Sequence, residues 1–154
     1  MRSMPLVLAA FVLLPLAGAM AAGKDGYDVQ PIKSEGKFIG CMAINEDTGL
    51  TFIGTAETFS VVMTAENFKV AKGDPVSGTW TIDGGKVRPL GVKADGPSTV
   101  SADFEATMAN IKPFMDGTEV TVALGKNTIE FDLSGSMAAM NELNACMTKG
   151  TTAK

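Results

Sequence analysis

The chain has 154 residues with 13 basic and 17 acidic side chains, a net charge of −4 at neutral pH. This length suits one domain with a single core. The chain is acidic and has no basic cluster, which argues against binding to nucleic acids or to an anionic membrane surface. The sequence contains no histidine, which excludes Ser-His-Asp and Cys-His catalysis and removes the commonest zinc ligand.

The N-terminal segment has the layout of a cleaved secretory signal. Arg2 supplies a positive charge, residues 6–16 form an apolar stretch, and the small residues around Ala19 and Ala21 provide cleavage frames. The apolar stretch is about half the ~20 residues that a membrane span needs. We therefore predict a signal peptide over residues 1–21, with cleavage at a neighbouring alanine as the alternative, and a periplasmic or secreted location.

The only two cysteines, Cys41 and Cys146, are 105 positions apart. In an oxidising compartment two such cysteines usually form one intramolecular bridge, so we predict a disulfide between them. A redox-active pair, a buried free thiol and an intermolecular bridge stay open as alternatives, although redox pairs usually lie close together as in C-x-x-C.

The rest of the chain predicts a mainly β domain. Residues 22–35 are polar and contain glycine and proline, so we expect a flexible N-terminal lead-in before a single β-rich domain over residues 36–150. From there, apolar residues alternate with polar ones between turns, which indicates strands. The expected strands cover residues 37–44, 50–54, 58–64, 76–82, 86–93, 98–106, 119–124 and 128–133, with a short additional strand at 68–71 as an option.

Turn residues support this pattern. Asp83-Gly84 joins two of the strands, and Asp-Gly supplies the positive φ angles that a tight hairpin needs. Pro89 places its strand at an edge or marks a bulge. Residues 107–115 can form a short helical turn that Thr107 caps and Pro113 limits.

The last predicted element is a helix over residues 135–148, capped by Ser134 or Ser136 and ended by Gly150. Its apolar stripe comprises Ala139, Met140, Leu143, Cys146 and Met147. A bridge from Cys146 would hold this helix on the strand at 37–44. We therefore predict an antiparallel β-sandwich or small barrel-like domain with one C-terminal helix.

Two residue pairs are candidates for chemistry. Glu130 and Asp132 share one strand face and could serve a carboxylate-dependent hydrolase, but the alternation places them toward solvent. Met137 and Met140 form an M-x-x-M pair of the kind that binds Cu(I), although methionine more often fills gaps in a core. We assign no catalytic residue, resident metal or cofactor.

The C-terminal stretch from Phe131 to Cys146 reads F-D-L-S-G-S-M-A-A-M-N-E-L-N-A-C. It resembles the tail of small secreted proteobacterial proteins of the invasion-associated locus B family. That resemblance implies a β-rich, sandwich-like body before a strand–helix tail, and an envelope or secreted location. The family usually carries further cysteines in its body, where this chain has only Cys41.

Together these observations favour a non-enzymatic periplasmic or secreted binding domain that acts on a protein partner, for example as an inhibitor or an envelope or host-interaction factor. The loops at residues 47–49, 95–98 and 112–117 are candidate contact sites. A small-ligand or copper carrier and a carboxylate-dependent hydrolase are the alternatives.

Overall fold

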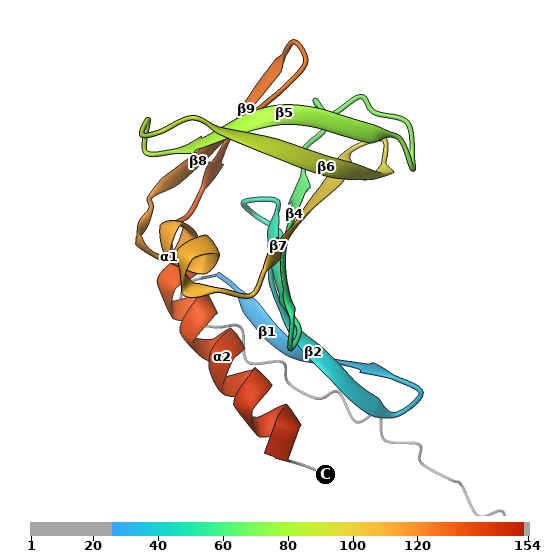
Figure 1. Cartoon of the computed structure of the whole chain (residues 1–154), viewed down its shortest axis with the longest axis vertical. Helices are drawn as coiled ribbons and strands as arrows, with labels where there is room; N and C mark the ends of the chain where they lie inside the picture. Colours follow the sequence, from blue (N-terminus) through green and yellow to red (C-terminus); the bar gives the residue numbers. More distant parts are fainter. Residues whose placement is uncertain (1–25, 153–154) are drawn as a thin grey trace, which may run out of the picture.

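In the computed structural model, which describes residues 26–152, nine strands pair antiparallel in the order β1-β2-β3-β4-β7-β6-β5-β8-β9 (Figure 1). The strands are β1 (Asp28–Ser34), β2 (Lys37–Asn45), β3 (Leu50–Gly54), β4 (Thr58–Thr64), β5 (Pro75–Ile82), β6 (Arg88–Gly96), β7 (Thr99–Glu105), β8 (Glu119–Leu124) and β9 (Asn127–Asp132). The helices are α1 (Met108–Asp116) and α2 (Ser136–Thr152). The predicted mainly β class and the C-terminal helix are confirmed.

The sheet bends at β6, which divides it into two halves. β6 pairs with β5 from Arg88 to Lys93 but with β7 only at its end, and the register shifts between Ala94 and Gly96. Such a bulge increases the local bend and twist. Figure 1 shows β5, β6 and β8 lying across one side of the fold, with β4, β7 and β2 turned away from them. The arrangement is sandwich-like, with β1 and β9 at opposite ends of the order, and it is not a closed barrel.

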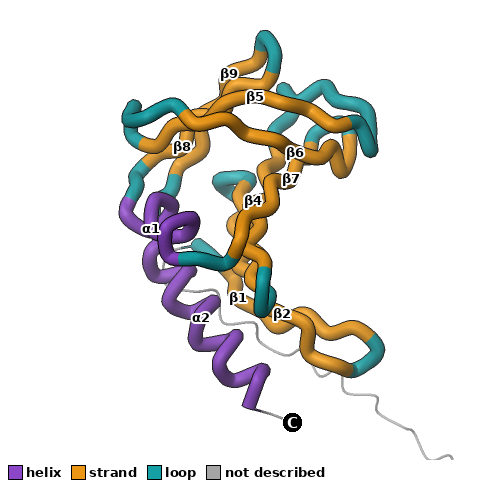
Figure 2. The backbone as a smooth tube through the Cα atoms, viewed as in Figure 1, coloured by secondary structure: helices purple, strands orange, loops and turns teal. Residues whose placement is uncertain are grey.

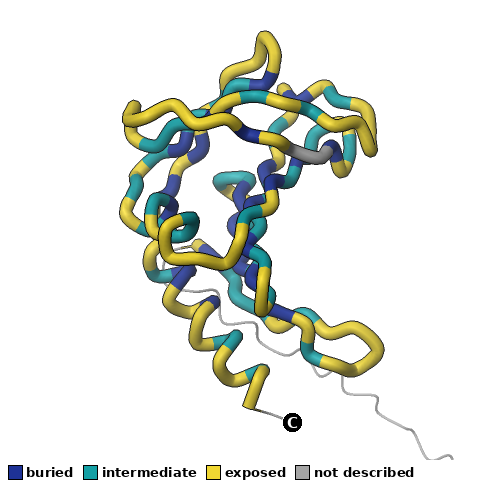
Figure 3. The backbone as a smooth tube through the Cα atoms, in the orientation of Figure 1, coloured by how far each residue is buried: buried dark blue, intermediate teal, exposed yellow. Residues whose placement is uncertain are grey.

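The core lies between these halves and under the helices. Figure 3 shows the buried positions concentrated along the strands that face this interior, while the outward side of α2 is exposed. Fully buried side chains come from both halves of the sheet, among them Phe52, Phe59, Val100 and Val120. The alternating apolar and polar residues that predicted the strands therefore correspond to alternating buried and exposed positions.

The prediction of a flexible lead-in is wrong for residues 28–35. β1 (Asp28–Ser34) pairs with β2 from Asp28–Ile44 to Ser34–Lys37, and Glu35 and Gly36 form the positive-φ turn between the two strands. This strand escapes a pattern search because it lies at an edge, is only half-buried and contains Pro31, which edge strands tolerate. Residues 1–25, with the predicted signal peptide, lie outside the described part.

Two further expectations about strands need correction. No strand forms at residues 68–71; the N–H of Phe68 donates to the carbonyl of Ala65 and the buried ring packs on Phe131, with 6.1 Å between ring centroids. β6 is an interior strand of the sheet, yet the described pairing to β7 covers only its last residues. Pro89 therefore has no β7 residue paired with it. A proline is tolerated at such a position because it has no N–H to donate to a neighbouring strand.

The fold has a second helix beyond the predicted C-terminal one. α1 is nine residues long and covers the predicted helical turn, but Thr107 makes no side-chain capping bond and Pro113 lies inside the helix instead of ending it. α1 buries Phe114 against the core. This long-range contact stabilises a helix that is too short to be stable on its own.

α2 continues to Thr152, so the prediction that Gly150 ends it is wrong. A Cβ atom on Gly150 would clash with the ring of Phe38, so this glycine lets the β2 side chain pack directly on the helix backbone. Ser136 does not act as an external cap either. It is the first residue of the helix, and its hydroxyl donates to the carbonyl of Phe114 at 2.6 Å.

The predicted Asp83-Gly84 turn is confirmed and has an additional role. Both residues adopt positive φ, and the N–H of Gly85 donates to the carbonyl of Ile82 at 2.9 Å. The carboxylate of Asp83 accepts hydrogen bonds from the hydroxyl and N–H of Thr118 and from the N–H of Glu119. The turn is thus tied to the start of β8.

We expect Asp83→Asn to lower stability at neutral pH and to make little difference in acid. Hydrogen bonds from the hydroxyl and N–H of Thr118, then from Glu119, hold the pKa of Asp83 below 3.8. A lowered folded-state pKa stabilises the protein above the unfolded value, and that contribution is lost as the pH falls through the folded value. Urea midpoints at pH 7 and in acid, where the Asp83 carboxylate is protonated, measure the change.

The matched control for this prediction is Asp95→Asn, because Asp95 is also an exposed aspartate followed by a glycine and lies at the end of β6. This substitution should leave the urea midpoint nearly unchanged at both pH values. A difference between Asp83→Asn and the unsubstituted protein that stays constant across the pH range would contradict the role of the charge.

Candidate functional site

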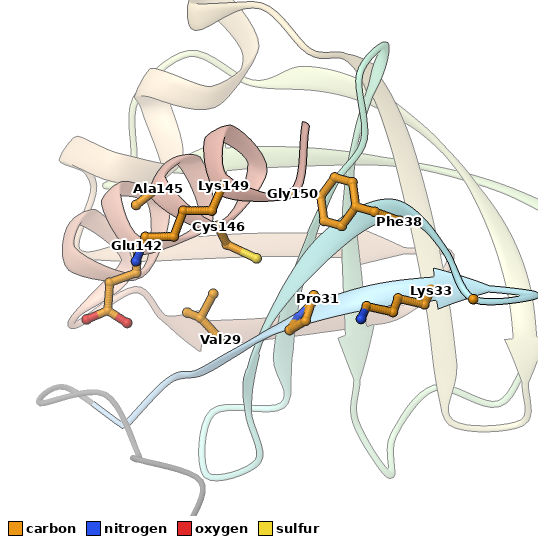
Figure 4. Close-up of a pocket in the computed structure, with 10 residues that line it drawn as sticks. Val29, Pro31, Lys33, Phe38, Glu142, Ala145, Cys146, Lys149 and Gly150 are labelled. Carbon is orange, nitrogen blue, oxygen red and sulfur yellow. The ribbon is translucent and has the colours of Figure 1, made fainter. Parts of the chain in front are cut away.

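Two grooves run along different flanks of α2. The first, which we call the disulfide groove, has a volume of about 630 Å³ and lies between α2 and the β1–β2 hairpin (Figure 4). Its lining residues come from three elements and one turn: Val29, Pro31, Lys33, Gly36, Phe38, Glu142, Ala145, Cys146, Lys149 and Gly150. This volume is within the range of ligand and peptide pockets.

The predicted disulfide between Cys41 and Cys146 is confirmed, with 6.2 Å between the two Cα atoms. Cys41 lies on β2 and is completely buried, while Cys146 lies on α2. In Figure 4 the sulfur of Cys146 points from the helix toward the sheet. The bridge holds the two walls of the disulfide groove at a fixed separation.

The disulfide groove combines an apolar surface with charges on both walls. Lys33 on β1 and Lys149 and Glu142 on α2 are exposed, and in Figure 4 they flank the apolar side chains of Val29 and Phe38. None of the three charged groups forms an ion pair with another residue of the 26–152 segment. Their charges are thus accessible to a bound molecule.

The edge strand β1 forms the outer wall of this groove. Pro31 lacks an N–H, and the register of β1 shifts between Ile32 and Lys33. Proline, lysine and bulges on an edge strand oppose the addition of another strand. A partner at this wall would therefore contact side chains more readily than it would extend the sheet.

The second groove, which we call the methionine groove, lies between α1, α2 and the β3–β4 turn and has a volume of about 440 Å³. All its lining residues are uncharged: Gly54, Thr55, Ala56, Thr58, Phe59, Ala106, Met108, Ile111, Met115, Met140, Asn141, Leu143, Asn144 and Met147. In Figure 2, α1 and α2 lie next to each other.

The predicted M-x-x-M pair does not form a site. Met140 is 4% exposed and lines the methionine groove, whereas Met137 is 50% exposed and does not line it. Three other methionines, Met108, Met115 and Met147, join Met140 there. Met108 and Met115 are seven residues apart on α1, as are Met140 and Met147 on α2. This spacing is visible in the sequence and places the two methionines of each pair on one face of their helix.

The carboxylate pair considered for hydrolysis is solvent-facing as predicted. Glu130 and Asp132 are both exposed on β9. Hydrogen bonds from the hydroxyl and N–H of Ser134 lower the pKa of Asp132, so this carboxylate stabilises the turn before α2 in its charged form. Neither residue has the desolvated environment of a typical general acid.

The single tyrosine of the sequence, Tyr27, is a core residue. It is 2% exposed, its ring stacks on Phe52 with 5.6 Å between centroids, and its hydroxyl has no hydrogen-bond partner among the described residues. Burial raises the pKa of Tyr27 to about 12, the nearby Thr48 hydroxyl opposes the shift and Asp132 adds to it. Tyr27 therefore stays protonated at neutral pH.

Two of the three candidate contact loops meet at the end of β4, and the third belongs to a helix. The loop at 47–49 and the loop at 95–98 both reach the end of β4, because Thr64 donates to the carbonyl of Gly49 and Ala65 donates to the carbonyl of Ser98. The segment at 112–117 is largely helical, as the C-terminal half of α1.

Within residues 26–152 there is no group of three or more acidic, cysteine or histidine side chains arranged to hold a metal.

Comparisons with known proteins bear on the fold. No family model matches the chain, and no curated protein matches it. No helix of the 26–152 segment is long and apolar enough to span a membrane. Among solved structures, invasion associated protein B from Bartonella henselae is similar, with a TM-score of 0.56 and 16% identity over 81% of this chain and 95% of that chain. Over that part of the chain the two proteins share a fold, which supports the resemblance to the invasion-associated locus B proteins noted from the sequence.

Proposed function

We propose that this protein is a non-enzymatic binding domain that works outside the cytoplasm and holds a protein partner in the disulfide groove. The observation that carries the proposal is the groove itself, in which a disulfide fixes a helix and an edge hairpin on either side of an apolar surface with accessible charges. Disulfides persist in oxidising compartments, which supports the periplasmic or secreted location.

The charges of the groove indicate which partner surface it suits. Lys33 and Lys149 outnumber Glu142, so the groove is locally basic although the chain as a whole is acidic. A partner loop with an apolar side chain for the surface around Phe38 and a carboxylate for the lysines would match this pattern. Complementary charge favours specificity and the rate of association.

The fold likeness gives a setting for such a partner. The similar solved structure is described as an invasion associated protein of Bartonella henselae. A role at the bacterial envelope or at contact with a host cell is compatible with that description and with a disulfide-closed binding domain. Inhibition of an extracellular enzyme is one form that this role can take.

Site-specific photo-crosslinking in the cell of origin tests the proposal. A photoreactive amino acid at Ala145, an exposed position in the groove, should give a discrete protein adduct, whereas one at Thr128, exposed on β9, should not. The double variant Lys33→Glu/Lys149→Glu should reduce the adduct by roughly tenfold, equivalent to about 1.4 kcal/mol of binding free energy.

The matched control is Lys86→Glu/Lys126→Glu, which reverses the charge of two exposed lysines outside the groove and changes the net charge by the same amount. This control should leave the adduct from Ala145 unchanged. Equal adducts from Ala145 and Thr128, or an adduct that both double variants weaken alike, would refute the assignment of the groove as the partner site.

A further inference from the structure

We propose that the methionine groove binds a lipid chain with an uncharged polar head, such as a fatty alcohol or a monoacylglycerol. This inference concerns a different flank of α2 and goes beyond the protein-binding role of the disulfide groove. It rests on the size of the methionine groove, on the arrangement of its methionines and on the absence of charge in its lining.

The methionines form two rows. Met108 and Met115 are seven residues apart on α1, and Met140 and Met147 are seven residues apart on α2. Seven residues of helix span about 10 Å, so the two methionines of each pair lie about two turns apart on one face of their helix. Methionine side chains are flexible and polarisable, which suits them to contact a chain that has no fixed shape.

The same spacing argues against a Cu(I) or Ag(I) site. Soft monovalent ions need several sulfur ligands at one point. With about 10 Å between the two members of each row, one ion is within reach of roughly one methionine per helix. An extended apolar ligand can contact all four side chains at once.

Burial and charge define the two ends of the expected ligand. Phe59, Met140 and Leu143 are 5% exposed or less and form the apolar floor, while Met108 is 61% exposed at the rim. A carboxylate or phosphate head would find no cationic partner in the lining. The exposed amides of Asn141 and Asn144 offer hydrogen bonds to a hydroxyl or ester instead.

The test uses the whole chain, expressed with its own N-terminal segment and purified in oxidised form. The neutral fluorescent probe 1-N-phenylnaphthylamine should bind saturably, and monododecanoylglycerol should displace it at least tenfold better than dodecanoate does at neutral pH. Met108→Glu should weaken probe binding by roughly tenfold because it places a carboxylate at the rim.

Met137→Glu is the matched control, since Met137 is also an exposed helical methionine but lies outside the groove. It should bind the probe like the unsubstituted protein. Ala106→Trp, at an exposed lining position, should weaken binding by filling the slot without adding charge. Lys33→Glu/Lys149→Glu should leave probe binding unchanged, so that a failure here is distinguishable from a failure of the protein-binding proposal.

Four results would overturn the assignment. They are the absence of saturable probe binding, displacement by dodecanoate as strong as that by monododecanoylglycerol, equal weakening by Met108→Glu and Met137→Glu, and stoichiometric Ag(I) binding that expels the probe. The last result would identify a soft-metal site in place of a lipid site.

Discussion

Replacing both cysteines by alanine is expected to lower the free energy of unfolding by about 4 to 5 kcal/mol. The bridge between Cys41 and Cys146 closes a loop of 105 positions, and in the chain-entropy model a loop of that size contributes about 4.7 kcal/mol by restricting the unfolded chain. Net stabilities of whole domains are about 5–15 kcal/mol. The loss would therefore remove a large share of the stability.

Urea unfolding of the oxidised protein, the reduced protein and Cys41→Ala/Cys146→Ala measures this effect. The reduced protein and the double variant should unfold at similar urea concentrations, and the reductant should not change the double variant further. A loss below about 1 kcal/mol would mean that the packing of α2 on β2 holds the helix without the bridge.

The same variant should impair both grooves, because α2 is a wall of each. Crosslinking from Ala145 and binding of the neutral probe should decline together when the bridge is removed. Substitutions inside one groove should affect only that groove. This difference separates a loss of the shared scaffold from a loss of either binding surface.

The sequence was sufficient for the features that depend on local chemistry. Asp83-Gly84 predicts a hairpin turn because few residues accept positive φ, and the turn is there. Val120 and Val122 alternate with polar neighbours, and both are buried in a strand with the predicted bounds. The pairing of Cys41 with Cys146 followed from their number and from the expected compartment.

Features that depend on neighbours distant in sequence could not be predicted. β1 is a strand because β2 pairs with it, although Pro31 and its polar composition disguise it. Gly150 lies within α2 because the ring of Phe38 takes the space of a side chain. In isolation, glycine is expected to weaken or end a helix.

The grooves show the same limit. Spacing along one helix places Met140 and Met147 on one face, but it does not reveal that Met108 and Met115 of another helix lie across from them. The M-x-x-M spacing of Met137 and Met140 misled because one side chain points outward and the other inward. Tertiary packing, which the spacing does not contain, decides which methionines meet.

Replacing Phe114 by alanine is expected to cost about 3–5 kcal/mol, the usual range for deleting a buried aromatic ring. Phe114 is 3% exposed, and α1 inserts it between the two halves of the sheet. Its ring lies 5.2 Å from that of Trp80 in one half and 5.9–6.2 Å from the rings of Phe52, Phe59 and Phe104 in the other. Each aromatic pair adds to the stabilisation from burial.

Phe38→Ala is the matched control, because it deletes the same side chain from a half-buried position outside this cluster. Urea unfolding should show a clearly smaller loss for Phe38→Ala, and only Phe114→Ala should alter the near-ultraviolet circular dichroism of Trp80, which stacks on Phe114 with an interplanar angle of 15°. Since α1 also forms a wall of the methionine groove, Phe114→Ala should weaken probe binding as well. Equal losses of stability in the two variants would mean that the halves of the sheet hold together without the ring of Phe114. In that case other contacts hold α1 in place, such as the hydrogen bond from the Ser136 hydroxyl to the carbonyl of Phe114.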